Sequence, residues 1–439
     1  MNKPLLVVCL AACRSTSAPP AVAPPKLDAI IQKTVHDSHL LGLAAVIVDH
    51  GKVVLDKGYG FTDLDHKTPI TGDTVFAIGS LTKQFTAAAV LTLVADGKLK
   101  LSDHAATFFP ELPADVTIQQ LLWQTSGLAE YAWGINTGKS ADELVHFIAT
   151  TPQMFPTGTR WAYSNSNYFV LGRVVEMVSK QSFGDYLRDH VLVRAGLHAT
   201  AVCTPTMPQA RPSLAVGDAP QQGGDLMIDF YGAAGNVCST AHDLLRWQDA
   251  LFGGKVLSPA GLAAMITPGT LADGSATTYG SGLVIDHVGQ HARIWHNGGL
   301  PAGYESELTW YPDDKLQIVL LTNTGNSPPA VTLGKLEHAL AVEQLHIVTP
   351  KPRDLALGSD ALAAYAGTYK MENPAPLAAD VTVAGSHLHV RIAGGVDDDL
   401  LAQGSGSFVL SKNASVEYRF VPGGLEVYKD GGKIATLTR

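Results

Sequence analysis

The stretch FAIGSLTKQF, residues 76–85, places a serine and a lysine three residues apart at the start of an apolar segment. Residues i and i+3 of a helix share a face, so we expect the side chains of Ser80 and Lys83 to touch. The segment that follows is apolar almost all round and ends before Gly97, a residue type common at helix C-termini. We therefore predict a helix over residues 80–95 that is buried on all sides.

A serine beside a buried lysine indicates acyl-transfer chemistry. A serine hydroxyl is a weak nucleophile unless a base takes its proton, and a lysine serves as that base where burial disfavours the ammonium. Gly79 lets other backbone approach closely, and the helix N-terminus offers N–H groups to a developing oxyanion. Alone, the spacing is weak evidence, because ordinary composition produces about one such pair per chain of this size. The alternative is an exposed lysine in a first helical turn.

Length and composition are those of a folded, mildly acidic protein that is too long for one compact core of ordinary size. The chain has 439 residues, of which 16% are charged and 46% hydrophobic, and a formal net charge of −9. This length predicts two domains, or one large domain with an appendage. Lysines and arginines are scattered singly, so no nucleic-acid partner is expected. The sequence carries no His-Glu-x-x-His zinc motif, phosphate loop or Gly-x-Ser-x-Gly elbow, and we expect neither a cofactor nor a metal.

The N-terminus is typical of an export signal followed by a linker. A short apolar run, Leu5 to Ala12, precedes a stretch rich in Pro, Ala and Ser, and it is too short to cross about 30 Å of hydrocarbon. The run Leu10-Ala11-Ala12-Cys13 resembles the lipobox of bacterial lipoproteins. We therefore expect a signal over residues 1–13, lipidation of Cys13, a linker over residues 14–26, and a periplasmic protein anchored to a bacterial membrane. Cleavage further on, releasing a soluble protein, is the alternative.

Periodicity predicts an α+β domain over residues 27–348. A helical pattern opens this region, a mostly helical part occupies residues 117–247, and a helix over residues 330–345 closes it. Strand patterns occur at both ends, at residues 43–48, 52–56, 280–287, 292–296, 307–311 and 317–321. Helices that flank a sheet built from both ends of a domain indicate an α+β or three-layer arrangement rather than a βαβ array.

In the last region, residues 354–439, apolar residues recur at every second position, and tight turns separate these stretches. Short strands without a helical stretch predict a small antiparallel barrel or sandwich.

Cys203 and Cys238 are the two cysteines outside the predicted signal. In an oxidising compartment they form either one disulfide or two separate buried thiols, and the spacing does not decide between these.

Further segments follow the Ser-x-x-Lys stretch in a recognisable order: LLWQTSGL, FPTGTRWAYSNSNYFVLGRVVEMV, GAAGNVCSTAHDLLRW and WHNGGLPAGYESELTWYPDDKLQIVLLTN. With it they resemble the serine β-lactamase-related hydrolases, which include class C β-lactamases, D-alanyl-D-alanine carboxypeptidases, D-aminopeptidases and some esterases. The resemblance covers about residues 27–345 and implies a β-lactamase/transpeptidase-like fold, an antiparallel sheet flanked by helices plus a helical subdomain. The C-terminal region resembles the lipocalin-like tail of some members.

The resemblance assigns roles to two further motifs. Tyr163-Ser164-Asn165 matches Tyr-x-Asn, in which the tyrosine shares the proton with the lysine and the asparagine binds the substrate amide. A phenol beside an ammonium is expected to shift toward phenolate. His296-Asn297-Gly298, followed by Gly299, matches the edge-strand motif that reads Lys-Thr-Gly in β-lactamases.

A histidine at that place changes the expected chemistry. His296 is mostly neutral at pH 7, so it offers a substrate carboxylate no permanent cation. We expect Gly298 to leave room for the substrate backbone, and the Gly299 N–H to act as an oxyanion donor beside that of Ser80. Gln124 stands where the family often has histidine, and LVRAGL replaces the usual Pro-Leu-Gly-Met turn; we interpret both changes as structural. Tyr304 and Glu305 are candidates for the pocket rim.

These observations predict an exported serine hydrolase that forms an acyl-enzyme. Ser80, Lys83 and Tyr163 are the predicted catalytic residues, and the predicted substrate-binding residues are Asn165, His296, Gly298 and Gly299. The substrate expected first is a peptide that contains D-amino acids, cleaved by a DD-carboxypeptidase or D-aminopeptidase type of activity. A carboxylesterase, a class C-like β-lactamase and a non-catalytic penicillin-binding sensor are the alternatives.

Overall fold

The computed structural model describes residues 24–65, 67–131, 139–325, 331–347, 352–371, 377–393, 395–413, 416–429 and 432–439. The predicted signal with Cys13, and the linker up to residue 23, lie outside the described residues, so export and lipid anchoring stay predictions. Helix α1 (Pro25–Asp37) begins before the predicted end of the linker, because proline is well tolerated in a first helical turn. Within the described part of the chain, no helix has the length and apolar character needed to cross a membrane.

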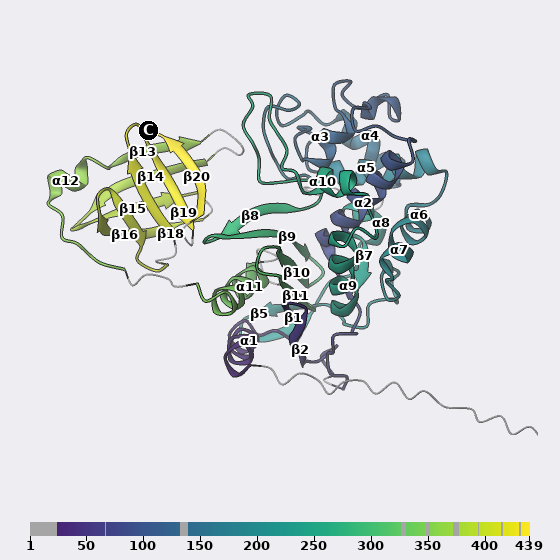
Figure 1. The fold of residues 1–439 in the computed structure, drawn as a ribbon, viewed down its shortest axis with the longest axis horizontal. Coiled ribbons are helices and arrows are strands. Elements are labelled where there is room, and N and C mark those ends of the chain that lie inside the picture. Colours follow the sequence, from purple (N-terminus) through teal and green to yellow (C-terminus); the bar gives the residue numbers. More distant parts are fainter. Residues whose placement is uncertain are drawn as a thin grey trace, which may run out of the picture.

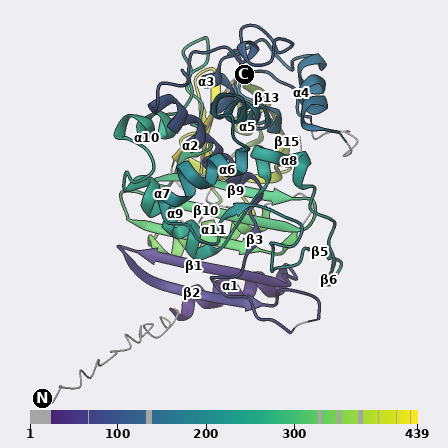
Figure 2. The same cartoon turned by 90° about the vertical axis from the view of Figure 1, so that its right-hand side faces the viewer.

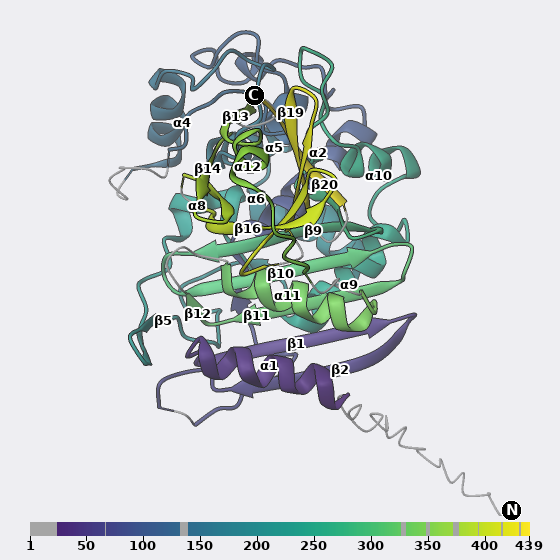
Figure 3. The same ribbon diagram turned by 90° about the vertical axis from the view of Figure 1, so that its left-hand side faces the viewer.

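A six-stranded antiparallel sheet forms the centre of the first domain, in the order β2-β1-β11-β10-β9-β8. Strands from both ends of the domain pair in it, as the sequence predicts. Figures 2 and 3 show its two faces. Its strands are β1 (Gly42–Asp49), β2 (Lys52–Gly60), β8 (Val284–Val288), β9 (His291–Leu300), β10 (Tyr304–Tyr311) and β11 (Leu316–Thr322).

One predicted strand differs from the sheet that forms. The pattern over residues 280–287 predicts a strand, but β8 begins only at Val284. Gly282 has a φ of +75°, a left-handed conformation that turns the chain instead of extending it. The strand-forming residues before this glycine therefore lie outside the sheet, and β8 is too short to cover the whole of β9.

Helices cover both faces of the sheet, which confirms the three-layer α+β arrangement (Figure 1). Helices α1 and α11 (Val331–Gln344) lie on one face. The larger layer lies on the other face and includes α2 (Thr82–Ala95), α3 (Ile118–Leu122), α4 (Ala141–Thr150), α5 (Asn165–Ser179), α6 (Phe183–Leu187), α7 (Val193–Ala195), α8 (Ile228–Gly235), α9 (Ala241–Phe252) and α10 (Pro259–Ile266), with short turns η1 (Gly79–Leu81), η2 (Ala105–Thr107) and η3 (Arg188–Leu192).

Helix α2 is the centre of the larger layer. Every residue from Thr82 to Leu93 is buried, which confirms the prediction of a helix without a solvent face. Its first turn is a separate 3₁₀ turn, η1, so the α-helix proper begins two residues after Ser80. The nucleophile candidate thus sits in a tight turn at the N-terminus of a helix that the core encloses.

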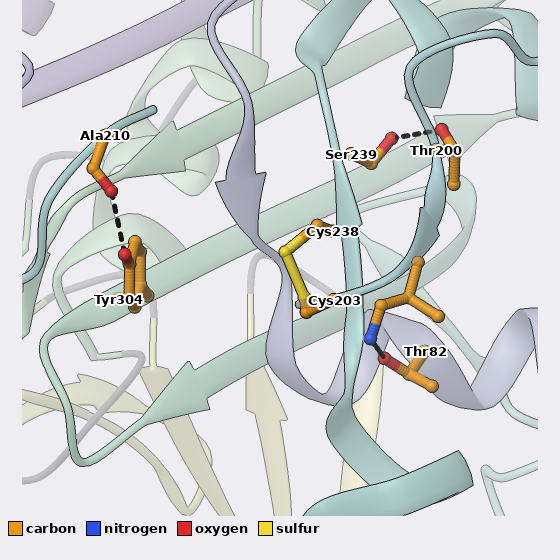
Figure 4. The surroundings of a disulfide bond; sticks show 8 residues. Thr82, Thr200, Cys203, Ala210, Cys238, Ser239 and Tyr304 are labelled. Atoms are coloured by element: carbon orange, nitrogen blue, oxygen red, sulfur yellow. Dashed lines mark hydrogen bonds between the residues drawn. A yellow bond between two sulfur atoms is a disulfide. The ribbon is translucent and has the colours of Figure 1, made fainter. Parts of the chain in front are cut away.

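A small sheet ties this turn to a disulfide. It comprises β3 (Phe76–Ala77), β7 (Val237–Ser239) and β4 (Ala201–Val202), and a second small sheet contains β5 (Ser213–Val216), β6 (Ala219–Gln222) and β12 (Thr324–Gly325). Cys203 and Cys238 form a disulfide with Cα atoms 5.0 Å apart, which decides between the two states that the sequence leaves open (Figure 4). Cys238 pairs with Ala77, three residues before Ser80, so the disulfide braces the strand that leads into η1.

The C-terminal region forms a closed antiparallel barrel of eight strands, which selects a barrel over a sandwich. The strands are β13 (Gly367–Met371), β14 (Leu377–Ala384), β15 (His387–Ile392), β16 (Asp397–Gly404), β17 (Ser407–Leu410), β18 (Val416–Val421), β19 (Gly424–Lys429) and β20 (Gly432–Thr438). The expectation of no helix is wrong here, because α12 (Ser359–Ala363) precedes the barrel. Its Leu362 is 2% exposed and joins the barrel core, and this tertiary contact stabilises a helix too short to be stable alone.

A buried carboxyl group on the α11 side of the sheet gives a test of the fold. Glu307 on β10 is 1% exposed, and neither of its carboxylate oxygens has a hydrogen-bond partner within the described residues. Burial, together with the charge of Glu337, raises the pKa of Glu307 well above its usual range. The protonated acid is therefore the form that the fold accommodates.

We predict that Glu307→Gln makes the protein more stable at pH 8 but not at pH 4.5. The unfolded carboxyl titrates at about 4.3, so the stability that protonated Glu307 contributes is complete below that pH and is lost as the pH rises toward the raised folded pKa. The amide does not ionise, so the gain at pH 8 should be about 1–3 kcal/mol. Urea unfolding at both pH values measures the difference in free energy of unfolding between the variant and the wild type. Asp115→Asn, at an exposed site, is the control, and an equal effect of Glu307→Gln at the two pH values would contradict the prediction.

Candidate active site

The turn that carries Ser80 packs directly on strand β9. Gly79 has a φ of +52°, and a Cβ added to it would lie 3.0 Å from the Gly299 nitrogen. A Cβ added to Gly298 would lie 2.2 Å from the Ile78 carbonyl oxygen and 3.0 Å from the Ser80 nitrogen. We expected Gly298 to leave room for substrate backbone; the turn of the serine itself fills that space instead. Both glycines are needed because two backbones meet here without room for a side chain.

Lys83 is held by three oxygens from three parts of the chain. Its Nζ lies 3.0 Å from Ser80 Oγ, 2.8 Å from Asn165 Oδ1 and 2.7 Å from the Ala234 carbonyl oxygen. Its side chain is fully buried, and this burial lowers the pKa of Lys83 to about 7, although the negative charge of Glu130 acts in the opposite direction. An amine with this pKa is present in both forms near neutral pH, as a general base requires.

Tyr163 lies on the other side of the serine. Its OH donates a hydrogen bond to Ser80 Oγ at 2.7 Å, and Lys83 Nζ lies 4.7 Å from the centre of its ring. Burial raises the pKa of Tyr163 well above 10. The expected shift toward phenolate is therefore wrong for the resting site, because desolvation outweighs the nearby ammonium. Lys83 is the group able to accept a proton, and Tyr163 is a phenol able to donate one.

Strand β9 presents a free edge next to the serine. On the β8 side its pairing ends with Trp295 opposite Val284, so residues 296–300 have no strand partner there among the described residues. An exposed edge of this kind pairs with an extended peptide by main-chain hydrogen bonds. The edge includes Gly299, whose nitrogen adjoins η1. The arrangement suits an extended acyl substrate that passes Ser80, and the oxyanion role of Gly299 stays a prediction.

His296 is a buried, neutral histidine. It is 2% exposed, its Nε2 lies 3.0 Å from Tyr279 OH, and its Nδ1 lies 2.5 Å from the carbonyl oxygen of Asn297. The carbonyl only accepts, so Nδ1 carries the proton and Nε2 accepts from Tyr279. Burial, and then the charge of Lys83, lower the pKa of His296 to about 3. This residue therefore does not replace the lysine cation of β-lactamases.

Two residues of the site were missed as functional candidates in the sequence. Glu130 Oε2 accepts a hydrogen bond from the Asn165 nitrogen at 2.6 Å, and its charge reaches Lys83 and Tyr163. Gln124, with a φ of +62°, accepts at Oε1 from the Ser164 nitrogen at 3.0 Å. Both lie in or just after the segment LLWQTSGL. The sequence singled out Gln124 only as a structural departure and did not single out Glu130, because only the folded chain places both beside the Tyr-x-Asn segment.

The two candidates for the pocket rim lie elsewhere. Tyr304 is buried and its OH donates to the Ala210 carbonyl oxygen at 2.7 Å. Glu305 is buried and its carboxylate accepts from the Leu333 nitrogen of α11, on the sheet face away from Ser80. Alternation along β10 explains the error for Glu305, since its neighbour Ser306 is the residue that points to η1 and donates to Ile78 O.

Comparisons with known proteins show the family and the fold of the chain. The model of the family described as Beta-lactamase matches residues 27–343. Penicillin-binding protein 4* of Bacillus subtilis (strain 168) is 24% identical over 441 residues, covering 91% of this chain and 96% of that protein. The octameric penicillin-binding protein homologue from Pyrococcus abyssi has a TM-score of 0.65 at 20% identity, covering 94% of this chain and 99% of that one. D-amino acid amidase from Ochrobactrum anthropi SV3 has a TM-score of 0.61 at 24% identity, covering 73% and 99%.

We predict that Ser80→Ala abolishes covalent labelling by a fluorophosphonate. Ser80 Oγ is the hydroxyl within hydrogen-bond distance of both Lys83 Nζ and Tyr163 OH, so its removal leaves the probe without an activated nucleophile. Intact-mass measurement detects the adduct. Ser164→Ala, which removes a neighbouring hydroxyl that contacts the Ala129 carbonyl oxygen instead, should still be labelled. Labelling that persists in Ser80→Ala would assign the nucleophile to another residue.

The rate of this labelling should follow the titration of Lys83. With a pKa of about 7, Lys83 becomes neutral as the pH rises, so the rate should fall about tenfold per unit below pH 7 and level off above it. Because the charge of Glu130 raises the pKa of Lys83, Glu130→Gln should move the midpoint to lower pH. The exposed Glu111→Gln should leave it in place. A midpoint that moves upward, or not at all, in Glu130→Gln would refute the assignment.

Proposed function

Because the chain belongs to the beta-lactamase family, we propose that it is a serine hydrolase of the D-aminopeptidase type, which cleaves the amide bond after an N-terminal D-amino acid through an acyl-enzyme. The observation that carries this proposal is the charge pattern of the site, a neutral His296 together with the carboxylate of Glu130. The D-amino acid amidase named above supports the substrate class as an analogy.

The proposed reaction uses the groups around Ser80 in sequence. Neutral Lys83 accepts the Ser80 proton while Oγ forms a bond to the substrate carbonyl carbon, and the N–H groups of Ser80 and Gly299 hold the oxyanion. The C–N bond then breaks, and Tyr163 gives its proton to the departing amine and regains one from Lys83. In the second half of the reaction, Lys83 accepts a proton from a water molecule that attacks the ester carbonyl. The bond to Ser80 Oγ then breaks, Oγ regains a proton, and the acid is released. The hydrogen bonds that join Lys83, Ser80 and Tyr163 support this order.

Charge separates the possible substrates. A DD-carboxypeptidase substrate and a β-lactam both carry a carboxylate near the scissile bond, and a buried histidine whose pKa is about 3 does not pair with it. The ammonium of an N-terminal D-amino acid finds an opposite charge in Glu130, which lies one hydrogen bond from Asn165. This contrast favours an aminopeptidase or amidase over a carboxypeptidase or a class C-like β-lactamase.

A carboxylesterase is the second candidate, because an uncharged ester requires no ionic partner and also suits a neutral His296. A non-catalytic penicillin-binding sensor is less well supported. The lowered pKa of Lys83 and its hydrogen bond to Ser80 are features of a working base, which a retired site does not require. Intact-mass analysis separates these two cases: a lasting adduct indicates a sensor, and loss of the adduct with product indicates an enzyme.

We predict that the enzyme hydrolyses D-phenylalanine amide faster than N-acetyl-D-phenylalanine amide, measured as kcat/KM by released ammonia. Acetylation removes the ammonium that pairs with Glu130 and leaves the scissile bond unchanged. Glu130→Gln should lower kcat/KM for the free amine about tenfold, the effect of one charge-assisted hydrogen bond, and change the acetylated substrate much less. L-phenylalanine amide and a chromogenic ester complete the panel. Faster cleavage of the ester, or of the acetylated amide, would reject the aminopeptidase assignment in favour of an esterase or another acyl specificity.

A further inference from the structure

The end of helix α8 presents two successive carbonyl groups to helix α2. Gly232 has a φ of +43° and a ψ of −133°, which interrupt the helix. The last carbonyl groups of a helix have no partner within it, so they need acceptor contacts elsewhere. Thr86 Oγ1 donates to the Ala233 oxygen at 2.7 Å, and Lys83 Nζ donates to the Ala234 oxygen, also at 2.7 Å. Two residues on one face of α2 therefore hold adjacent peptide groups of the same segment.

Thr86 is enclosed and makes its shortest contact with this segment. Its side chain is fully buried, and its Oγ1 lies 3.3 Å from the Thr82 carbonyl oxygen, further than from the Ala233 oxygen. Helix α5 also approaches Ala233 closely, because a Cβ added to Gly172 would lie 2.3 Å from the Ala233 Cβ. Ala233 is thus packed against α5 and hydrogen-bonded to α2.

The far end of the segment is held by other contacts. Thr82 Oγ1 accepts a hydrogen bond from the Val237 nitrogen at 2.9 Å (Figure 4). The Val237 carbonyl oxygen accepts from the Ile78 nitrogen at 3.0 Å, and the next residue, Cys238, belongs to the disulfide. Thr86 supplies the side-chain hydrogen bond at the near end, directly beside the peptide group that carries the Ala234 carbonyl.

We propose that Thr86 is a positioning residue of the active site, whose hydroxyl fixes the Ala234 carbonyl group against the amine of Lys83. Thr86 acts through the backbone between Ala233 and Ala234 and not on the reacting atoms. The proposal rests on the role of Lys83 as the base that activates Ser80, which it shares with the proposed function. It does not depend on which acyl group the enzyme cleaves.

The surroundings of Lys83 explain why this carbonyl matters. A carbonyl oxygen that accepts from an ammonium favours the charged form of the amine. Burial raises the pKa of both phenols near the amine well above 10 and lowers the pKa of the nearby imidazole to about 3, so the one carboxylate supplies the negative charge. Loss of the Ala234 acceptor should therefore lower the pKa of Lys83 further. The titratable groups that face Lys83 are Glu130, Tyr163, Tyr168 on α5 and His296 on β9.

The test is the pH dependence of fluorophosphonate labelling in Thr86→Val, which keeps the shape of the side chain and removes its hydroxyl. The midpoint of the labelling rate should fall by at least about half a pH unit, since complete loss of a hydrogen bond to a charged group corresponds to about one to two units. Thr86→Ser retains the hydroxyl and should keep the wild-type midpoint. An unmoved or raised midpoint in Thr86→Val, or an equal fall in Thr86→Ser, would overturn the proposal.

Thr92→Val is the matched control for a general loosening of α2. Thr92 is also buried, and its Oγ1 donates to the Ala89 carbonyl oxygen at 2.7 Å, but it lies about 13 Å further along the helix than Lys83. This variant should lower the thermal midpoint of unfolding, as Thr86→Val does, and leave the labelling midpoint in place. An equal fall of the labelling midpoint in Thr92→Val would reject a specific role for Thr86.

A second substitution covers the case in which Thr86→Val does not fold. Thr86→Cys has a side chain of similar size and a weak S–H donor, so its labelling midpoint should fall by a smaller amount. An unmoved midpoint in folded Thr86→Cys would also overturn the proposal.

Failure of this proposal and failure of the proposed function give different results. Fluorophosphonate labelling needs the activated serine and no particular acyl group, so substrate data that reject the aminopeptidase leave the prediction for Thr86→Val intact. If the midpoint falls in Glu130→Gln but not in Thr86→Val, only the role of Thr86 is rejected. Labelling that persists in Ser80→Ala would reject both proposals.

Discussion

The enclosure of the Lys83 amine is the constraint on which the rest of the site depends. A buried amine is tolerated only where polar groups replace the water that it has lost. Ser80, Asn165 and Ala234 supply these groups from the turn before α2, the start of α5 and the end of α8. The three elements must therefore converge on one point. The same enclosure sets the chemistry, because the desolvation that demands these partners also lowers the pKa of Lys83 to about 7.

Burial has opposite consequences for the two side chains that flank Ser80. It disfavours the charged form of each group, so it removes the proton from an ammonium and keeps the proton on a phenol. Lys83 is thereby able to accept a proton near neutral pH and Tyr163 able to donate one, although their ordinary pKa values are nearly equal. One physical effect thus assigns two roles, and the identity of each side chain decides its direction. His296 follows the same rule and stays neutral.

Close backbone packing connects this chemistry to the sheet. The turn that carries Ser80 lies on Gly298, while β8 stops short of this part of β9 and leaves the adjacent edge free. The predicted oxyanion donors and the free edge of β9 therefore belong to one closely packed unit. The β3-β7 pair and the disulfide brace the strand that enters this turn. Asn236 joins β7 to the segment that contains Ala234, whose carbonyl oxygen accepts from Lys83.

The sequence by itself determined the features that depend on short separations along the chain. The i, i+3 spacing placed Ser80 beside Lys83, the lack of a polar face predicted the buried helix, and alternation predicted most of the sheet and the β-rich character of the C-terminal region. Only the tertiary structure decided what depends on distant segments meeting: the carbonyl of Ala234, the carboxylate of Glu130, the disulfide, the closure of the barrel, and the protonated state of Tyr163. The reason is physical. Spacing determines which side chains of one helix or strand share a face, whereas pKa values and hydrogen-bond partners depend on the burial that the whole fold creates.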